Sequence, residues 1–267
     1  SVKTRNLLSM WKTIASAYGM RSVPMPFIPC LANCYSGYMV LLPSIPSRFI
    51  CIWQRRKAKS ETQSNSSALL LYVKLGILSP RLIIAHGIYV DDDEIRMLAD
   101  HGVKVVHNPA SNMKLASGIQ FKFCEMRKAG VTVALGTDGC SSSNNLDMIE
   151  AMKLASLLGK AWRKDPEAIP ASEIFQAATE AGALAIGLKA GRIAEGYLAD
   201  LCLVDLDIPA FTPNHNFVSN LVYAANGSCI DTVICDGKIL MQDKKVPGEE
   251  EIMEHTAELA YKLVREP

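Results

Sequence analysis

Between residues 69 and 188, short apolar runs alternate with segments of helical character. The apolar runs have the length and composition of buried strands, and they cover Leu82–Ala85, Val103–Val106 and Val131–Leu135. Helices are predicted after them, from the acidic run at Asp91 to His101, over Phe121–Ala129 and over Leu146–Trp162, with two shorter helices beyond, separated by Pro166 and Pro170. Strands that alternate with helices across short loops predict parallel βα units and an α/β fold.

The segments on either side of this region follow different patterns. A helix followed by the start of a strand is predicted over Trp11–Val23, but prolines and the lack of any clean period predict no regular element from about 24 to 67. After Gly191 we expect a small β unit and then a charged helix at about Glu249–Arg265. Its predicted strands are Ala199–Val204, Val218–Tyr223, Ile230–Cys235 and Lys238–Met241, with turn signals at Asn226-Gly227 and Asp236-Gly237. The pattern predicts three parts, residues 1–67, 68–190 and 191–267.

Composition narrows the function classes. A hydrophobic content of 49% in 267 residues is enough for a sizeable core, and a net charge of +1 gives no reason to expect nucleic acid or an anionic membrane as partner. The basic run Gln54–Lys59 is interpreted as a solvated surface stretch. The eight cysteines form no C-x-x-C pairs, which indicates reduced thiols and a cytoplasmic location. No signal peptide or long apolar run is present, so a soluble chain is expected.

Candidate chemistry lies where the three predicted strands end. His86, His107 and Asp138 each follow one of the apolar runs. A lone histidine there is more often structural, and a lone aspartate before glycine is more often a turn former. Because parallel strands end at a common edge, however, the three side chains are expected to converge. A carboxylate and an imidazole at that edge could hold a divalent metal and activate water.

The motifs around these residues resemble the amidohydrolase superfamily. They are Ala85–Gly87, His107–Gly118, Ala134–Gly139, Ser143–Met148, Gly196–Leu201 and Ser219–Ala224. Within the superfamily they are most similar to methylthioadenosine/S-adenosylhomocysteine deaminases, with relatives among triazine chlorohydrolases. The resemblance runs from about Leu69 to near the C-terminus.

The resemblance implies a fold and a reaction. The fold would be part of a (β/α)8 TIM-type barrel, with strands six to eight at the three apolar runs, beside a small C-terminal β unit. Asp138 would bind the metal, contact the substrate and take a proton from the attacking water. His86 would orient that water and stabilise the transition state. One zinc, or iron, would be the cofactor, and an adenosine-like nucleoside would lose ammonia. Asn112, Lys114 and Asn144 would shape loops.

The sequence departs from the family before residue 86. The family metal site needs an H-x-H pair and a further histidine, yet no histidine precedes His86. The chain is therefore expected to be the C-terminal part of an enzyme, and Asp138 alone is not expected to hold the metal. A shift of frame across Ile52–Lys59 permits the family-like sequence His-Met-Ala-Glu-Thr-Glu-Gly-Glu, so we hypothesise that residues 24–67 are translated out of frame.

Three recognisable strands leave an open sheet edge, so either a second chain completes the sheet, as in a homo-oligomer, or the chain aggregates. The predicted partner is otherwise a small-molecule substrate, with no nucleic acid and no membrane. Two alternatives stay open: a chlorohydrolase or guanine deaminase, and a catalytically inactive fragment. A dinucleotide oxidoreductase is disfavoured because no G-x-G-x-x-G follows a strand.

Overall fold

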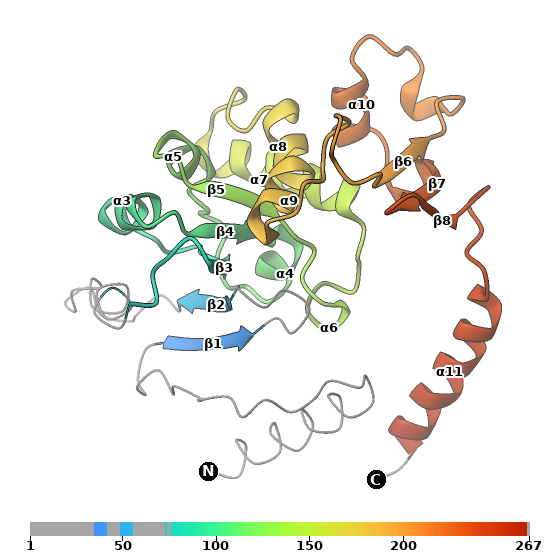
Figure 1. Ribbon diagram of the computed structural model, residues 1–267, viewed down its shortest axis with the longest axis horizontal. Coiled ribbons are helices and arrows are strands. Elements are labelled where there is room, and N and C mark those ends of the chain that lie inside the picture. Colours follow the sequence, from blue (N-terminus) through green and yellow to red (C-terminus); the bar gives the residue numbers. More distant parts are fainter. Residues whose placement is uncertain (1–34, 42–48, 56–72, 74–75, 266–267) are drawn as a thin grey trace.

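The computed structural model describes residues 35–41, 49–55, 73 and 76–265, the first two ranges by their backbone alone. Five strands form one sheet in the order β1-β2-β3-β4-β5 (Figure 1). Their bounds are Tyr35–Leu41, Phe49–Arg55, Leu82–His86, Lys104–His107 and Thr132–Leu135. The pairs β2–β3, β3–β4 and β4–β5 are parallel, whereas β1 is antiparallel to β2. The three strands predicted from apolar runs are confirmed, and each of their boundaries agrees with the prediction to within one residue.

Strands β1 and β2 correct the expectation that residues 24–67 hold no regular element. β2 contains the run Phe49-Ile50-Cys51-Ile52-Trp53, which is apolar at every position. A strand inside a parallel sheet can be apolar on both faces, so a search for strict alternation misses it. In the register of β2 with β3, Ile52 lies opposite Ala85 and Trp53 opposite His86. The helix predicted at Trp11–Val23 lies outside the described residues.

Helices lie close to the predicted ranges Asp91–His101, Phe121–Ala129 and Leu146–Trp162, and further helices that were not predicted lie between them. In chain order the helices are α3 (Asp92–Asp100), α4 (Pro109–Lys114), α5 (Phe123–Lys128), α6 (Cys140–Ser143), α7 (Met148–Arg163), α8 (Ala171–Ala178), α9 (Glu180–Ile186), α10 (Phe217–Tyr223) and α11 (Glu249–Arg265), with short 3-10 turns η1 (Pro209–Phe211) and η2 (Gly227–Cys229). At the start of α3, Asp91 accepts from the Glu94 backbone N–H while the Glu94 carboxylate accepts from that of Asp91. This capping box explains why the acidic run begins a helix.

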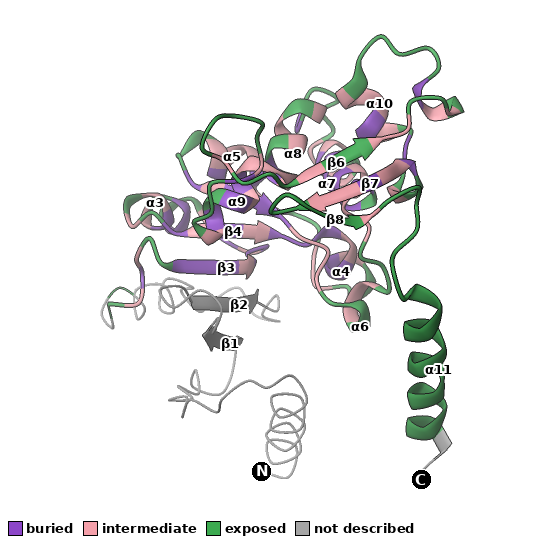
Figure 2. Cartoon of the chain, turned by 45° about the vertical axis from the view of Figure 1, so that its right-hand side comes forward, coloured by how far each residue is buried: buried purple, intermediate pink, exposed green. Residues whose placement is uncertain are grey.

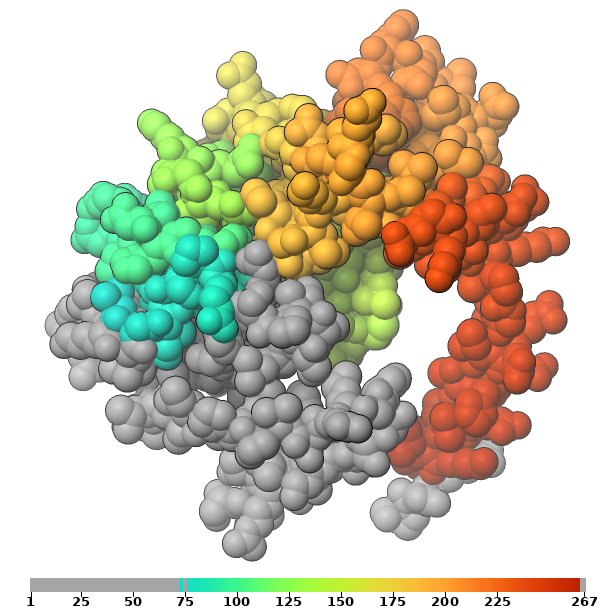
Figure 3. Space-filling model, viewed as in Figure 1, coloured from blue at the N-terminus to red at the C-terminus, as the bar shows by residue number. Residues whose placement is uncertain are grey.

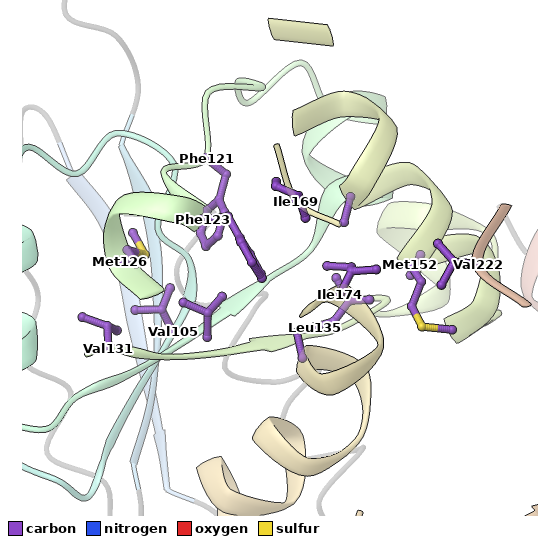
Figure 4. Packing of buried hydrophobic residues seen from close by; sticks show 14 of the residues in the cluster. Val105, Phe121, Phe123, Met126, Val131, Leu135, Met152, Ile169, Ile174 and Val222 are labelled. Carbon is purple, nitrogen blue, oxygen red and sulfur yellow. The ribbon is translucent and has the colours of Figure 1, made fainter. Parts of the chain in front are cut away.

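The hydrophobic core lies between the sheet and these helices. Figure 4 shows Phe123 and Met126 of α5 near Val105 of β4, while Ile174 of α8 lies near Leu135 of β5. Phe123, Met126 and Ile174 are 0% exposed. Burying a side chain of this size stabilises a fold by roughly 1.5–3 kcal/mol, so this packing holds β4 and β5 against α5 and α8.

A separate three-stranded antiparallel sheet follows, in the order β6-β7-β8. Its strands are Leu201–Val204, Ile230–Cys235 and Lys238–Met241, and the last two match the predicted bounds. The tight turn between them places both Asp236 and Gly237 at positive φ, as the Asp-Gly signal predicts.

The strand predicted at Val218–Tyr223 is wrong, because this segment forms α10. The side chain of Asn216 accepts from the Ser219 backbone N–H, which caps the helix. Leu221 and Val222 are buried, and α10 packs on α7 and α8. Tertiary packing and the cap therefore outweigh the strand preference of the β-branched and aromatic residues.

Helix α11 extends away from the small sheet (Figures 1 and 3), and residues 249–264 are all exposed, as the colouring of Figure 2 shows. Among the described residues, no helix combines the length and apolar character that crossing a membrane requires.

Candidate active site

Two of the polar residues predicted at strand ends come together in space. β3 ends at His86, and Asp138 follows β5 after Gly136 and Thr137. Because β3, β4 and β5 are parallel neighbours (Figure 1), residues that follow their last positions lie at the same, carboxyl-terminal end of the sheet. His86 Nε2 is 3.8 Å from Asp138 Oδ2, with the side chains 7% and 31% exposed. The imidazole is thus buried while the carboxylate can be reached from solvent.

Both residues have left-handed backbone conformations. The φ angle is 72° at His86 and 61° at Asp138. Such conformations are uncommon for residues other than glycine, and they cluster at functional sites. At His86 the left-handed turn also interrupts the alternation of β3, in which Leu82 and Ile84 face the helices and join the core. The backbone therefore directs both side chains toward one place at some conformational cost.

Helix α4 holds the pair through two neighbouring buried residues. The Ser111 hydroxyl donates to Asp138 Oδ2 at 2.6 Å, and Asn112 Oδ1 lies 2.8 Å from His86 Nδ1. Ser111 is 0% exposed and Asn112 1% exposed. The interpretation of Asn112 as a residue that only shapes a loop did not anticipate this contact, and Ser111 was not identified from sequence at all. The available signal was a pair of polar residues at the start of a helix that follows a strand end.

The surroundings of Asp138 favour its charged form. Partial burial raises the pKa of Asp138. Hydrogen bonds from Ser111, the Gly139 backbone and Ser142, together with the charge of His86, lower this pKa, and their combined effect is larger than that of burial. The net pKa lies below the ordinary value of 3.8. The Gly139 backbone N–H donates to Asp138 Oδ1 at 2.8 Å. At neutral pH this group is a carboxylate that can accept a proton or hydrogen bond.

His107, the third polar residue at a strand end, does not join the pair. Its ring stacks on Phe121 with centroids 4.1 Å apart and an interplanar angle of 8°. It lies two residues after Val105 and on the same face of β4, so it faces the helices and the core. Burial, with a smaller contribution from the charge of His86, lowers the pKa of His107 from 6.5 to about 3. His107 is therefore a neutral packing residue, and the expectation that all three side chains converge is corrected.

A cavity of about 590 Å³ opens beside α4. Its lining comes from the segment after β3, from α4 and from the stretch that follows α4: Tyr89, Asn112, Met113, Ala116, Gly118, Ile119 and Gln120. Asn112 belongs both to this cavity and to the hydrogen bond with His86. The cavity thus has the size of a small-molecule site and adjoins the His86–Asp138 pair. Nearby, Lys114 donates a hydrogen bond to Asn144 and links α4 to the end of α6, which agrees with a loop-shaping role.

The donor set for a metal is incomplete within the described part of the chain. Asp138 and His86 offer a carboxylate oxygen and an imidazole nitrogen, but the described residues contain no group of three or more His, Cys, Asp or Glu side chains that could hold a metal ion. A catalytic zinc is ordinarily held by three protein ligands. These residues alone therefore do not fit a catalytic zinc centre.

Comparison with known proteins adds a family to this geometry. A 5'-deoxyadenosine deaminase of Methanoregula boonei is 50% identical over 190 residues, which are 71% of this chain and 43% of the relative. A 5-methylthioadenosine/S-adenosylhomocysteine deaminase of Thermococcus onnurineus is 50% identical over 180 residues, 67% of this chain and 42% of the relative. The chain thus spans less than half the length of these relatives.

Solved structures agree. An adenosine deaminase from Xanthomonas campestris with bound zinc matches with a TM-score of 0.70 and 36% identity, over 74% of this chain and 45% of that chain. A zinc-containing atrazine chlorohydrolase from Arthrobacter aurescens matches with a TM-score of 0.67 and 25% identity, over 72% and 43%. The family model described as the amidohydrolase family matches residues 52–240, which include every element from β3 to β7. The chain belongs to the amidohydrolase family.

Proposed function

We propose that this chain supplies the Asp138–His86 half of an active site that deaminates adenosine-like nucleosides. The observation that carries the proposal is the 3.8 Å approach of His86 Nε2 to Asp138 Oδ2 at the carboxyl edge of a parallel sheet. The activities of the relatives, which act on 5'-deoxyadenosine, methylthioadenosine or S-adenosylhomocysteine, support the choice of substrate. The matched region would correspond to the last strands of a TIM-type barrel.

In the proposed reaction, water adds to the amino-bearing carbon of the purine while the π electrons of its C=N bond move to the adjacent ring nitrogen. The C=N bond re-forms when that carbon loses ammonia. Asp138 accepts a proton from the attacking water as the new C–O bond forms. The same carboxyl group then returns the proton to the amino group, so that the C–N bond breaks and neutral ammonia leaves. Because its pKa is lowered, Asp138 begins as a carboxylate, as this role requires. The buried imidazole of His86 accepts a hydrogen bond from the water at Nε2 and so orients it for attack.

We also propose that Asp138 is a ligand of a divalent metal, zinc or iron, in an active enzyme. The remaining ligands would have to come from groups that the described residues do not supply. We further propose that the chain forms a homo-oligomer, since β5 pairs only with β4 among the described strands and leaves an edge that a second chain can extend.

Two alternatives have observations in their favour. The likeness to atrazine chlorohydrolase favours a hydrolase that releases chloride, and the incomplete donor set favours an inactive chain. Ammonia and chloride release can be measured from 5'-deoxyadenosine, methylthioadenosine, S-adenosylhomocysteine, guanine and a chlorotriazine, with and without one equivalent of zinc. Ammonia from the adenosine compounds is expected. Release of chloride alone would show a chlorohydrolase instead, and release of ammonia from guanine alone would show a guanine deaminase. No release from any compound would show that the chain is inactive.

A further inference from the structure

Asn112 stands between the His86–Asp138 pair and the neighbouring cavity. It is 1% exposed, its Oδ1 lies 2.8 Å from His86 Nδ1, and its Nδ2 has no hydrogen-bond partner among the described residues. A buried amide N–H without a partner costs roughly 1–3 kcal/mol. Since Asn112 also lines the cavity, the unmet donor indicates a place for an acceptor atom of a bound molecule.

The contact with Oδ1 determines which nitrogen of His86 carries the proton. An amide oxygen can only accept, so the hydrogen bond requires a proton on Nδ1. In neutral His86 the other nitrogen, Nε2, then has a free lone pair. Nε2 is the nitrogen that lies 3.8 Å from Asp138 Oδ2, so it can accept a hydrogen bond in the space that both groups share. Asn112 therefore controls the form in which His86 meets the reacting water.

The cavity has the chemistry of an uncharged ring site. Apolar contacts come from Met113 and Ile119, and the polar groups are the Tyr89 hydroxyl and the amides of Asn112 and Gln120. Among the described residues, no charged side chain lines it. A purine ring has hydrophobic faces, and its ring nitrogens are hydrogen-bond acceptors. These features match a mainly apolar site with one buried amide donor.

We propose that Asn112 is a positioning residue that holds His86 in the Nδ1-protonated form through Oδ1, and that its Nδ2 donates a hydrogen bond to an acceptor atom of the bound nucleoside. The second half rests on the proposed function, whereas the first half depends only on the structure. Because the two halves use different atoms of one amide, they can be separated by substitution.

The wild-type chain gives the first test, by nitrogen-15 NMR of labelled histidines with long-range coupling to the ring protons. The two nitrogen shifts of a neutral imidazole show which one is protonated, and His86 is assigned by comparison with a His86→Gln sample. In the neutral imidazole of His86, a protonated Nδ1 and an unprotonated Nε2 are expected. A protonated Nε2 on His86 of the wild-type chain would overturn the first half.

Two variants of Asn112 then separate the roles. Asn112→Leu removes both, so His86 should lose its preference for Nδ1 protonation and the dissociation constant for adenosine should rise about 10-fold or more. Asn112→Asp keeps an acceptor oxygen but loses the donor, so the proton should stay on Nδ1 while adenosine binding weakens to a similar degree. Leu115→Met, at an exposed position directly after the same helix and outside the cavity lining, is the control and should change neither property by more than about 2-fold.

The two variants test the two parts of the proposal, the positioning of His86 and the hydrogen bond to the nucleoside, separately. An unchanged His86 spectrum in Asn112→Leu overturns the positioning role, and unchanged adenosine binding in both Asn112 variants overturns the ligand contact. These failures differ from failure of the proposed function. The latter is measured by ammonia release from the wild-type chain, which can occur even where Asn112 proves dispensable.

Discussion

The side chain of Asp147 accepts a hydrogen bond from the backbone N–H of Gly227, with 2.7 Å between Asp147 Oδ2 and the nitrogen. Its other oxygen, Oδ1, accepts from the backbone N–H groups of Ile149 and Glu150 and caps α7. One carboxylate thus starts the long helix that packs on β5 and α8 and joins it to the η2 turn before β7.

Asp147→Ala should therefore lower the free energy of unfolding by about 1–3 kcal/mol, because it removes a helix cap and leaves the Gly227 N–H without its acceptor. Urea denaturation followed by circular dichroism measures this loss. Asp147→Asn keeps one side-chain oxygen and should lose less. The exposed Asp207→Ala is the control and should stay within about 0.5 kcal/mol. Equal losses in Asp147→Ala and the control would show that the link is unimportant.

Gly136 allows β5 to pass close to the loop after β4. A Cβ atom there would lie 2.5 Å from Asn108 Oδ1 and 3.0 Å from Val106 Cγ1, and Asn108 is buried. Gly136→Ala should lower the free energy of unfolding by about 1–3 kcal/mol, because neither neighbour can move away freely. Gly139→Ala, where a Cβ would meet nothing within 4 Å, should be nearly neutral in the same thermal or urea unfolding experiment. Similar stability of both variants would contradict the close approach.

His107 should make stability depend on pH in the acid range. Its pKa is lowered in the folded chain from 6.5 to about 3, so above pH 6.5 both the folded and unfolded states are neutral at this residue. As the pH falls from 6.5 toward 3, the unfolded state takes up a proton that the folded state rejects. This residue then lowers the free energy of unfolding by up to about 1.4 kcal/mol per pH unit.

Substitution isolates that contribution. In His107→Phe, which keeps an aromatic ring against Phe121, unfolding should depend less steeply on pH between 6.5 and 4 than in the wild-type chain. His215→Gln, at an exposed histidine, should keep the wild-type slope. Urea unfolding at a series of pH values measures both, and parallel slopes for His107→Phe and the wild type would show that His107 takes up protons in the folded chain.

Sequence patterns predicted the helices, strands and turns whose conformation follows from local sequence signals rather than from tertiary packing. The apolar runs gave β3, β4 and β5, the Asp-Gly signal gave the β7–β8 turn, and the acidic run at Asp91 gave the start of α3. Segment 217–223 was misread because its strand-forming residues were weighed without the Asn216 cap and the helices it packs on. β2 was missed because a strand that is apolar throughout shows no alternation.

The site could be predicted only in part for a related reason. His86 and Asp138 were identified because each follows an apolar run, whereas the contribution of Ser111 and Asn112 depends on where α4 packs, which no local pattern encodes. His107 follows a run in the same way, but its place in the strand alternation directs it into the core. The proposal that residues 24–67 are out of frame and the division at residues 67 and 190 remain predictions, and the DNA sequence tests the first.

Ammonia release from 5'-deoxyadenosine in the presence of zinc, compared between the wild-type chain and Asp138→Asn, tests the central claim most directly. The two chains differ by one carboxylate oxygen, so folding and cavity shape are preserved while the proton acceptor beside His86 is lost. We predict ammonia release by the wild-type chain and a rate of release that is at least about 100-fold lower in the variant. Equal rates in the two chains, or no release by the wild-type chain, would contradict the claim that Asp138 and His86 form half of a deaminase active site.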